Sequence, residues 1–143
     1  MTHLHGATKI VMLFAAAMFL WALLLGTLKY GQILHSPEYR AHPYTDVAHR
    51  AALLYSFALL LISAFVQFGQ WDFSVNLAAA SAMAAYFAMA VAGYTWHGWR
   101  RDTENQFAPA SGGLQVFMVS LMTVEIGAWL ILVAGFVDRQ FLH

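Results

Sequence analysis

Long apolar segments alternate with short polar segments along the whole chain. The apolar segments cover about residues 10–28, 49–69, 75–96 and 114–137. Each has roughly the 20 residues that an α-helix needs to cross the hydrocarbon core of a bilayer. Because an unpaired backbone group is costly in lipid, each segment is predicted to be helical throughout. The pattern therefore predicts an all-α integral membrane protein, folded as an antiparallel four-helix bundle.

The composition agrees with a lipid bilayer as the surrounding medium. The chain of 143 residues is 61% hydrophobic and 10% charged, with a mean hydropathy of +0.61. A soluble core of this size could not hide so much apolar surface. The formal net charge is zero, which gives no sign of a nucleic-acid partner. The absence of cysteine excludes disulfides, iron–sulfur clusters, thiolate-ligated haem and a cysteine nucleophile.

The predicted spans define one transmembrane domain over residues 1–143. No repeat or linker divides the chain, and the first span lacks an obvious signal-peptide cleavage site. An even number of spans places both termini on one side. The basic residues in or beside the first and third loops favour a cytoplasmic position for these loops; they are Lys29, Arg40, Arg100 and Arg101. We expect a multi-pass protein of a bacterial-type inner (cytoplasmic) membrane.

Two histidines are predicted to lie at the same membrane face. His49 opens the second span and His97 closes the third, so antiparallel order brings both to one end of the bundle. A neutral imidazole near the end of a transmembrane helix is a usual axial ligand of haem, and Arg50 could pair with a propionate. The sequence therefore suggests haem b with iron held by His49, and His97 offers a second ligand for an electron-transfer site.

Each candidate residue also has a purely structural interpretation. His49 and Arg50 could be interfacial residues that extend toward the headgroups, and Tyr94 could belong to an aromatic belt. Glu125 falls near the middle of the fourth span, where a carboxyl group either has a function or hydrogen-bonds between helices. A zinc or di-iron centre fits less well, because no span pairs two ligands one turn apart with a carboxylate.

Several short motifs resemble one family of membrane isomerases. They are His5-Gly6 before the first span, AHRAALLY at the start of the second, the aromatic end of the third, and NQFAP before the fourth. Together with the four-span layout, they resemble the styrene oxide isomerase family. More distantly, the chain is similar to hydroxylaminobenzene mutase, another small four-span isomerase with an Ala-His pair opening its second span. The separation of His49 and Tyr94 matches the family without a gap.

The resemblance implies a specific chemistry. His49 would be the axial ligand of a b-type haem held between the subunits of a homotrimer, with ferric iron as Lewis acid. Tyr94 would hydrogen-bond or orient the substrate oxygen. The implied reaction is redox-neutral: the C–O bond of an epoxide is polarised, positive charge develops at the benzylic carbon, and a hydride shift yields an aldehyde.

The chain also departs from the family pattern. Tyr55 stands where the family has an asparagine, Tyr86 stands where it has an aspartate, and Glu125 has no counterpart. We therefore expect Tyr94, Tyr55 and Tyr86 to be the catalytic side chains, acting on an aryl epoxide or another small apolar, oxygen-bearing substrate. Two alternatives remain. One is a b-type haem protein for electron transfer or haem sensing that uses His49 and His97, and the other is a cofactor-free helper subunit.

Overall fold

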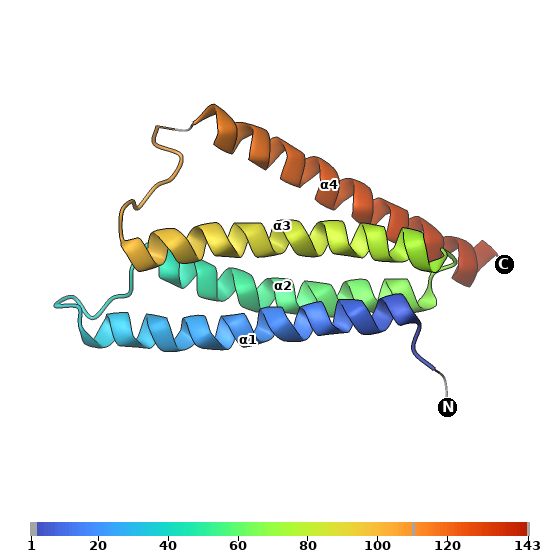
Figure 1. Cartoon of the computed structure of the whole chain (residues 1–143), viewed down its shortest axis with the longest axis horizontal. Helices are drawn as coiled ribbons and strands as arrows, with labels where there is room; N and C mark the ends of the chain where they lie inside the picture. The colour runs from blue at the N-terminus through green and yellow to red at the C-terminus, as the bar shows by residue number, and fades with distance from the viewer. Residues whose placement is uncertain (1–2, 110, 143) are drawn as a thin grey trace.

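The computed structural model describes residues 3–109 and 111–142. Its elements are α1 (Gly6–Leu34), α2 (Pro43–Phe68), α3 (Phe73–Arg100), α4 (Gly112–Val137) and a short π-helix, η1 (Asp138–Leu142). Four helices are long and apolar enough to cross a membrane. Successive helices run in opposite directions, so α1 begins and α4 ends at the same end of the bundle (Figure 1). The predicted all-α, four-span architecture is confirmed.

The first connection is shorter than the sequence suggested. Helix α1 continues to Leu34 and α2 begins at Pro43, which leaves only residues 35–42 between them. Pro43 suits the first turn of a helix, where no backbone N–H is needed. The preceding His42 side chain caps this end by accepting the N–H of Tyr44 at 3.3 Å. His49 therefore lies almost two turns inside α2, and the helix begins before the apolar span that His49 was expected to open.

Polar side chains also define the start of α3 and α4. Asp72 accepts the backbone N–H of Val75 at 2.9 Å, and Ser111 accepts that of Leu114 at 3.1 Å. Such caps satisfy N–H groups that have no partner inside the helix. Only residues 69–72 separate α2 from α3. These two helices are therefore antiparallel neighbours, as predicted.

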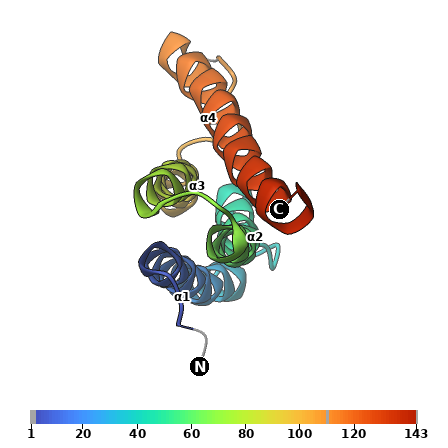
Figure 2. The ribbon, with the colours of Figure 1, turned by 90° about the vertical axis from the view of Figure 1, so that its right-hand side faces the viewer.

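Helices α1, α2 and α3 pack closely, whereas α4 crosses them obliquely (Figure 2). Many of the buried contacts among the first three helices come from alanine, which allows close approach of helix backbones in lipid. The buried apolar residues of α1 to α3 include Val11, Ala15, Ala22, Ala48, Ala52, Leu59, Val66, Ala80 and Val91. The core of the protein therefore lies mainly among α1, α2 and α3, and Ala128 and Leu132 of α4 complete it.

Helix α4 is attached through its C-terminal half. Its buried residues are Ala128, Leu132 and Gly135. The indole of Trp71 lies so close to Gly135 that a Cβ there would overlap it, and the Trp71 Nε1 donates to the carbonyl of Ile131 at 2.7 Å. The N-terminal half of α4 diverges from α3 (Figure 1). A cavity lies between the two helices near the third loop.

Candidate functional site

His49 is fixed by a hydrogen bond to the neighbouring helix. Its Nδ1 lies 2.9 Å from the backbone carbonyl oxygen of Ala22 on α1. Because a carbonyl can only accept, Nδ1 must carry the proton. In the neutral imidazole, Nε2 then holds the free lone pair. This is the arrangement that metal-ligating histidines usually adopt, with the second ring nitrogen donating to a carbonyl or carboxylate.

Gly26 provides space for the His49 ring against α1. A Cβ built at Gly26 would lie 3.1 Å from His49 Cε1, tighter than an ordinary van der Waals contact. Gly26 follows Ala22 by one helical turn, so the two small residues form one surface under the imidazole. The half-buried ring is therefore positioned by a hydrogen bond and by close packing.

Charged side chains lie near His49 at the same end of the bundle. Asp46 accepts from Lys29 Nζ at 2.6 Å, and its other carboxylate oxygen lies 2.8 Å from Arg50 Nη2. The ion pair of Lys29 with Asp46 joins α1 to α2. Two basic groups share one carboxylate, and the Arg50 side chain is 65% exposed. Positive charge therefore remains available to an anionic group next to His49.

An apolar groove lies on the same side of the bundle, between α1 and α2. Its volume is about 340 Å³, and its lining residues are Met12, Ala15, Ala16, Phe19, Ser56, Phe57 and Leu60. The Phe19 and Phe57 rings meet edge to face, with centroids 6.3 Å apart. Ser56 follows His49 by two helical turns and shares its face of α2. The groove therefore extends along the face of α2 that carries His49.

The predicted catalytic tyrosines lie on the other side, toward α3 and α4. The Tyr55 ring stacks on Phe87 of α3, with centroids 4.2 Å apart. Tyr86 packs near Phe117 of α4, with centroids 5.8 Å apart. Tyr55 is six residues beyond His49, which places it roughly 120° away around α2. One chain therefore does not bring these tyrosines together with the Nε2 atom of His49.

Tyr94 and His97 line a cavity of about 250 Å³ between α3 and α4. Its other lining residues are Met89, Ala90, Gly93, Gln106, Leu114, Phe117, Met118 and Leu121. It lies where α4 diverges from α3. Tyr94 and His97, one helical turn apart, therefore lie on one side of α3.

Tyr44 holds this region together and was not identified from the sequence. Its ring centroid lies 6.0 Å from that of Tyr94 and 5.5 Å from that of His97. The Tyr44 hydroxyl accepts the backbone N–H of Gln106 at 2.8 Å, linking α2 to the third loop. The sequence interpretation placed Tyr44 in the first loop. The preceding Pro43 was the signal that a helix starts there.

His97 has its own partners, distinct from those of His49. Its Nδ1 lies 2.7 Å from Asp102 Oδ1, and Arg100 Nε lies 3.5 Å from the other oxygen of Asp102. The hydrogen bond from His97 holds the pKa of the Asp102 carboxyl below its usual range. His49 packs on α1, whereas His97 packs on Tyr44 and lines the cavity next to α4. The two imidazoles therefore contribute to separate sites in one chain.

Glu125 is an unpaired carboxyl group on α4. Its Oε1 is buried and has no hydrogen-bond partner in the part of the chain that the structure describes. The described residues around Glu125 therefore offer no hydrogen bond between helices, which was one of the two roles expected for this side chain.

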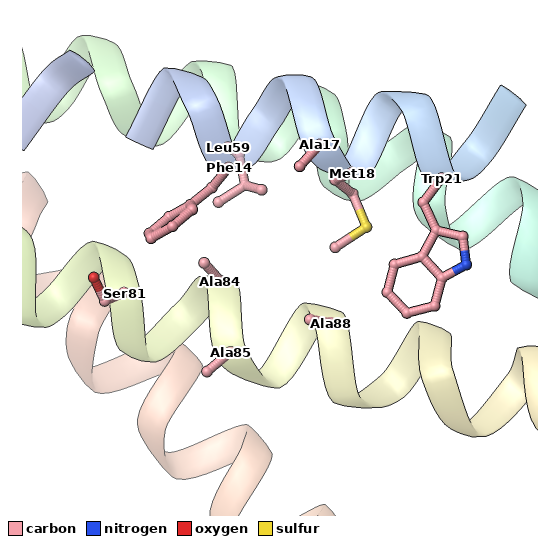
Figure 3. A pocket seen from close by; sticks show the side chains of 9 residues that line it. All are labelled: Phe14, Ala17, Met18, Trp21, Leu59, Ser81, Ala84, Ala85 and Ala88. Carbon is pink, nitrogen blue, oxygen red and sulfur yellow. The ribbon is translucent and has the colours of Figure 1, made fainter. Parts of the chain in front are cut away.

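A second apolar cavity, of about 360 Å³, opens between α1 and α3 (Figure 3). Phe14, Met18 and Trp21 of α1 reach toward Ala84 and Ala88 of α3 (Figure 3). The small residues of α3 thus line a cavity as well as allow close helix packing. None of the residues that line this cavity titrates. It suits a hydrocarbon group and offers no acid–base chemistry.

Comparison of the chain with models of protein families, with characterised proteins and with solved structures gives no match. Within residues 3–109 and 111–142, no three His, Asp or Glu side chains gather into a metal-ligating cluster. Function is therefore inferred from the residues and their geometry.

Proposed function

We propose that the protein is a membrane isomerase that depends on haem b, with His49 as the axial ligand of the iron. The hydrogen bond from His49 Nδ1 to the Ala22 carbonyl carries this proposal, because it leaves Nε2 as the ligating atom. The reaction would be the redox-neutral rearrangement of an aryl epoxide, or of a similar small oxygen-bearing substrate, to a carbonyl compound.

The surroundings of His49 fit a haem group. The groove between α1 and α2 offers Phe19 and Phe57 to the apolar macrocycle. Arg50, with Lys29 beside it, supplies positive charge for a propionate at the polar end of the same helices. One protein ligand is enough for such a centre, because the porphyrin supplies four nitrogens.

Bound haem would supply a Lewis acid that polarises the C–O bond of the substrate. The chain would supply the groups that orient the substrate. Tyr94 and Tyr55 each carry a phenol hydroxyl that makes no hydrogen bond within the described residues and can donate to an oxygen atom. Tyr86, beside Phe117, would shape the apolar part of the pocket.

The arrangement of these groups supports an oligomer. His49 lies on the α1 side of the bundle, whereas the tyrosines lie on the α3 and α4 side. A complete site would form if the α3–α4 side of one copy packed against the α1–α2 groove of the next. Such a head-to-tail contact closes into a ring when the rotation allows it. A homotrimer, as the family resemblance implies, is one such ring.

Absorption spectroscopy tests the haem. The protein is purified in mild detergent from haem-supplemented cells, together with His49→Ala and His97→Ala. We expect a Soret band in the wild-type protein, its loss in His49→Ala, and its retention in His97→Ala. A monodisperse wild-type protein without the band would reject haem binding. Loss of the band in His97→Ala as well would favour the electron-transfer alternative, for which the contacts of His97 with Asp102 and Tyr44 give no support.

Product analysis tests the reaction separately. Haem-loaded protein is incubated with a panel of aryl epoxides, and aldehyde formation is measured without any added oxidant or reductant. We expect turnover by the wild-type protein and at least a tenfold lower rate in Tyr94→Phe, the order expected for a lost hydrogen bond to a developing charge. Haem-loaded protein that turns over no member of the panel would exclude this substrate class.

A further inference from the structure

A polar pocket lies between the first and third loops, and its lining residues are distinct from those of the proposed isomerase site. Its volume is about 440 Å³. Six titratable side chains line it: His35, Glu38, Arg40, His42, Arg101 and Glu104. The two loops lie at the same end of the bundle, where α1 and α3 end (Figure 1). The pocket therefore gathers charged groups from two segments that are far apart in the sequence.

Gln32 holds the two walls of this pocket together. Its buried side chain donates from Nε2 to the Gly98 carbonyl of α3 at 3.0 Å, and its Oε1 accepts the His42 N–H at 2.9 Å. Arg101 ends α3 in the left-handed conformation, with a φ of 55°, at a position where glycine is usual. The pocket is therefore built on a backbone that hydrogen bonds and helix ends hold in place.

Charges of both signs line the pocket and do not pair with one another. Arg40 and Arg101 are cationic, and Glu38 and Glu104 are anionic. None of these four side chains makes an ion pair or a hydrogen bond within the described residues. Isolated surface charges can be left to water. Two charges of each sign around one hollow, however, are complementary to a ligand that carries both charges.

The two histidines add one donor and one acceptor. His42 Nδ1 accepts the N–H of Tyr44 at 3.3 Å, so Nε2 carries the proton of the neutral ring and can donate. His35 Nδ1 lies 2.8 Å from the Gly31 carbonyl oxygen and must donate to it, which leaves Nε2 of the neutral ring as an acceptor. The Nε2 atom of each ring therefore remains free for a ligand.

The chemistry of these groups selects a zwitterion with a phosphate and a primary ammonium group. A guanidinium group matches phosphate oxygens with two parallel N–H bonds, and a carboxylate accepts the N–H of a primary ammonium group. A quaternary ammonium group has no N–H and is usually bound by aromatic rings. None of the described residues that line this pocket is Phe, Tyr or Trp. Phosphoethanolamine therefore fits better than phosphocholine or a purely anionic phosphate.

Aromatic side chains place this end of the bundle at the depth of the lipid headgroups. Tyr30 near the end of α1, and Trp96 and Trp99 near the end of α3, are exposed. Such rings are enriched at the interface between membrane and water. A phospholipid can therefore present its head group to the pocket while its acyl chains stay beside the helices.

We propose that the pocket between the first and third loops binds the phosphoethanolamine head group of a phospholipid. Arg40, Arg101 and the Nε2 of His42 bind the phosphate. Glu38 and Glu104 accept the N–H groups of the ammonium. The site shares no residue with the proposed isomerase, so the two proposals can fail independently.

Native mass spectrometry of the delipidated full-length protein in detergent tests the site. Phosphatidylethanolamine, phosphatidylcholine and phosphatidylglycerol with identical acyl chains are titrated separately, so that only the head group differs. We expect phosphatidylethanolamine to bind roughly tenfold more tightly than the others, because only it offers N–H donors to the carboxylates. Equal binding of phosphatidylcholine overturns the proposal. If water-soluble glycerophosphoethanolamine binds as tightly as the lipid, a phospholipid is overturned as the source of the group.

Two double variants separate the two ends of the head group. Arg40→Gln with Arg101→Gln should weaken phosphatidylethanolamine binding by roughly tenfold or more. Glu38→Gln with Glu104→Gln should abolish the preference for phosphatidylethanolamine over phosphatidylglycerol. Lys9→Gln removes an exposed basic group at the opposite end of α1 and is the control, which should bind like the wild type.

The proposal is overturned if the arginine double variant binds phosphatidylethanolamine like the wild type, or if Lys9→Gln weakens binding equally. Should the arginine double variant not be monodisperse, an unchanged preference in the glutamate double variant overturns it.

Discussion

The imidazole of His49 on α2 donates a hydrogen bond across the helix interface to the backbone carbonyl of Ala22 on α1, with an Nδ1–O distance of 2.9 Å. This contact fixes both the orientation of the ring and the position of its proton. It leaves Nε2 as the only ring nitrogen that can bind a metal. An interfacial histidine that merely extended toward the headgroups would need no such partner. The relationship therefore links the packing of α1 on α2 to the proposed chemistry.

Enlarging Gly26 should weaken haem binding without removing the ligand. A methyl group there would lie 3.1 Å from His49 Cε1, so Gly26→Val must displace the imidazole. Overpacking of this kind costs about 1–3 kcal/mol, and we expect haem to bind at least tenfold more weakly. Haem titration followed at the Soret band measures the change. Gly31→Val is the matched control, because nothing lies within 4 Å of a Cβ at Gly31; equal affinities for the two variants would contradict the prediction.

Substitution of Gly135 should detach α4 from the bundle. The Trp71 indole occupies the space that a side chain at Gly135 would need, and its hydrogen bond to the Ile131 carbonyl depends on this position. We expect Gly135→Val to lower the free energy of unfolding by about 1–3 kcal/mol. Thermal unfolding in detergent and the emission spectrum of tryptophan report the change. Gly127→Val, at a position with open space, should have a free energy of unfolding close to that of the wild type. A similar loss in this variant would contradict the explanation, because it would show that a larger side chain destabilises α4 wherever it is placed.

Removal of the Gln32 amide should destabilise the end of the bundle near the first and third loops. Gln32 is buried; its Nε2 donates to the Gly98 carbonyl at 3.0 Å, and its Oε1 accepts the N–H of His42 at 2.9 Å. Gln32→Leu leaves both backbone groups unpaired, and we expect a loss of about 2 kcal/mol in the free energy of unfolding. Denaturation in mixed micelles measures it. Gln115→Leu, at an exposed position on α4, is the control, and a similar loss in it would contradict this explanation.

Acidification should weaken the contact between the third loop and α3. The His97 hydrogen bond holds the pKa of Asp102 below its usual range. A carboxyl group with a depressed pKa stabilises the fold above its unfolded-state pKa of about 3.9, and this contribution is lost as the pH falls through the lower, folded-state pKa. We expect the melting temperature of the wild type to fall more between about pH 7 and about pH 3 than that of Asp102→Asn. If the melting temperatures of the two proteins fell equally with pH, the contact between His97 and Asp102 would contribute nothing to stability.

The length and spacing of the apolar segments were enough to predict the architecture. Lipid forces each segment to be helical, and short connections force neighbours to be antiparallel. The sequence therefore predicted four spans and placed His49 and His97 at the same end of the bundle. It misplaced the end of α1 and the start of α2, because a helix can extend beyond the hydrocarbon region into polar sequence. Leu34 and Pro43 are the limits that the structure gives.

The partners of each side chain were decided by the tertiary structure alone. Helices that are apolar on all sides carry no pattern that tells a protein-facing side from a lipid-facing side. The rotation of α2, which directs His49 to α1 and Tyr55 to Phe87, follows from the close packing of small residues such as Ala22 and Gly26. Helix α4 is held at its C-terminal half by the Trp71 hydrogen bond, and Glu125 Oε1 has no hydrogen-bond partner among the described residues. Sequence thus determined which groups lie at which depth, and packing between helices determined which of them meet.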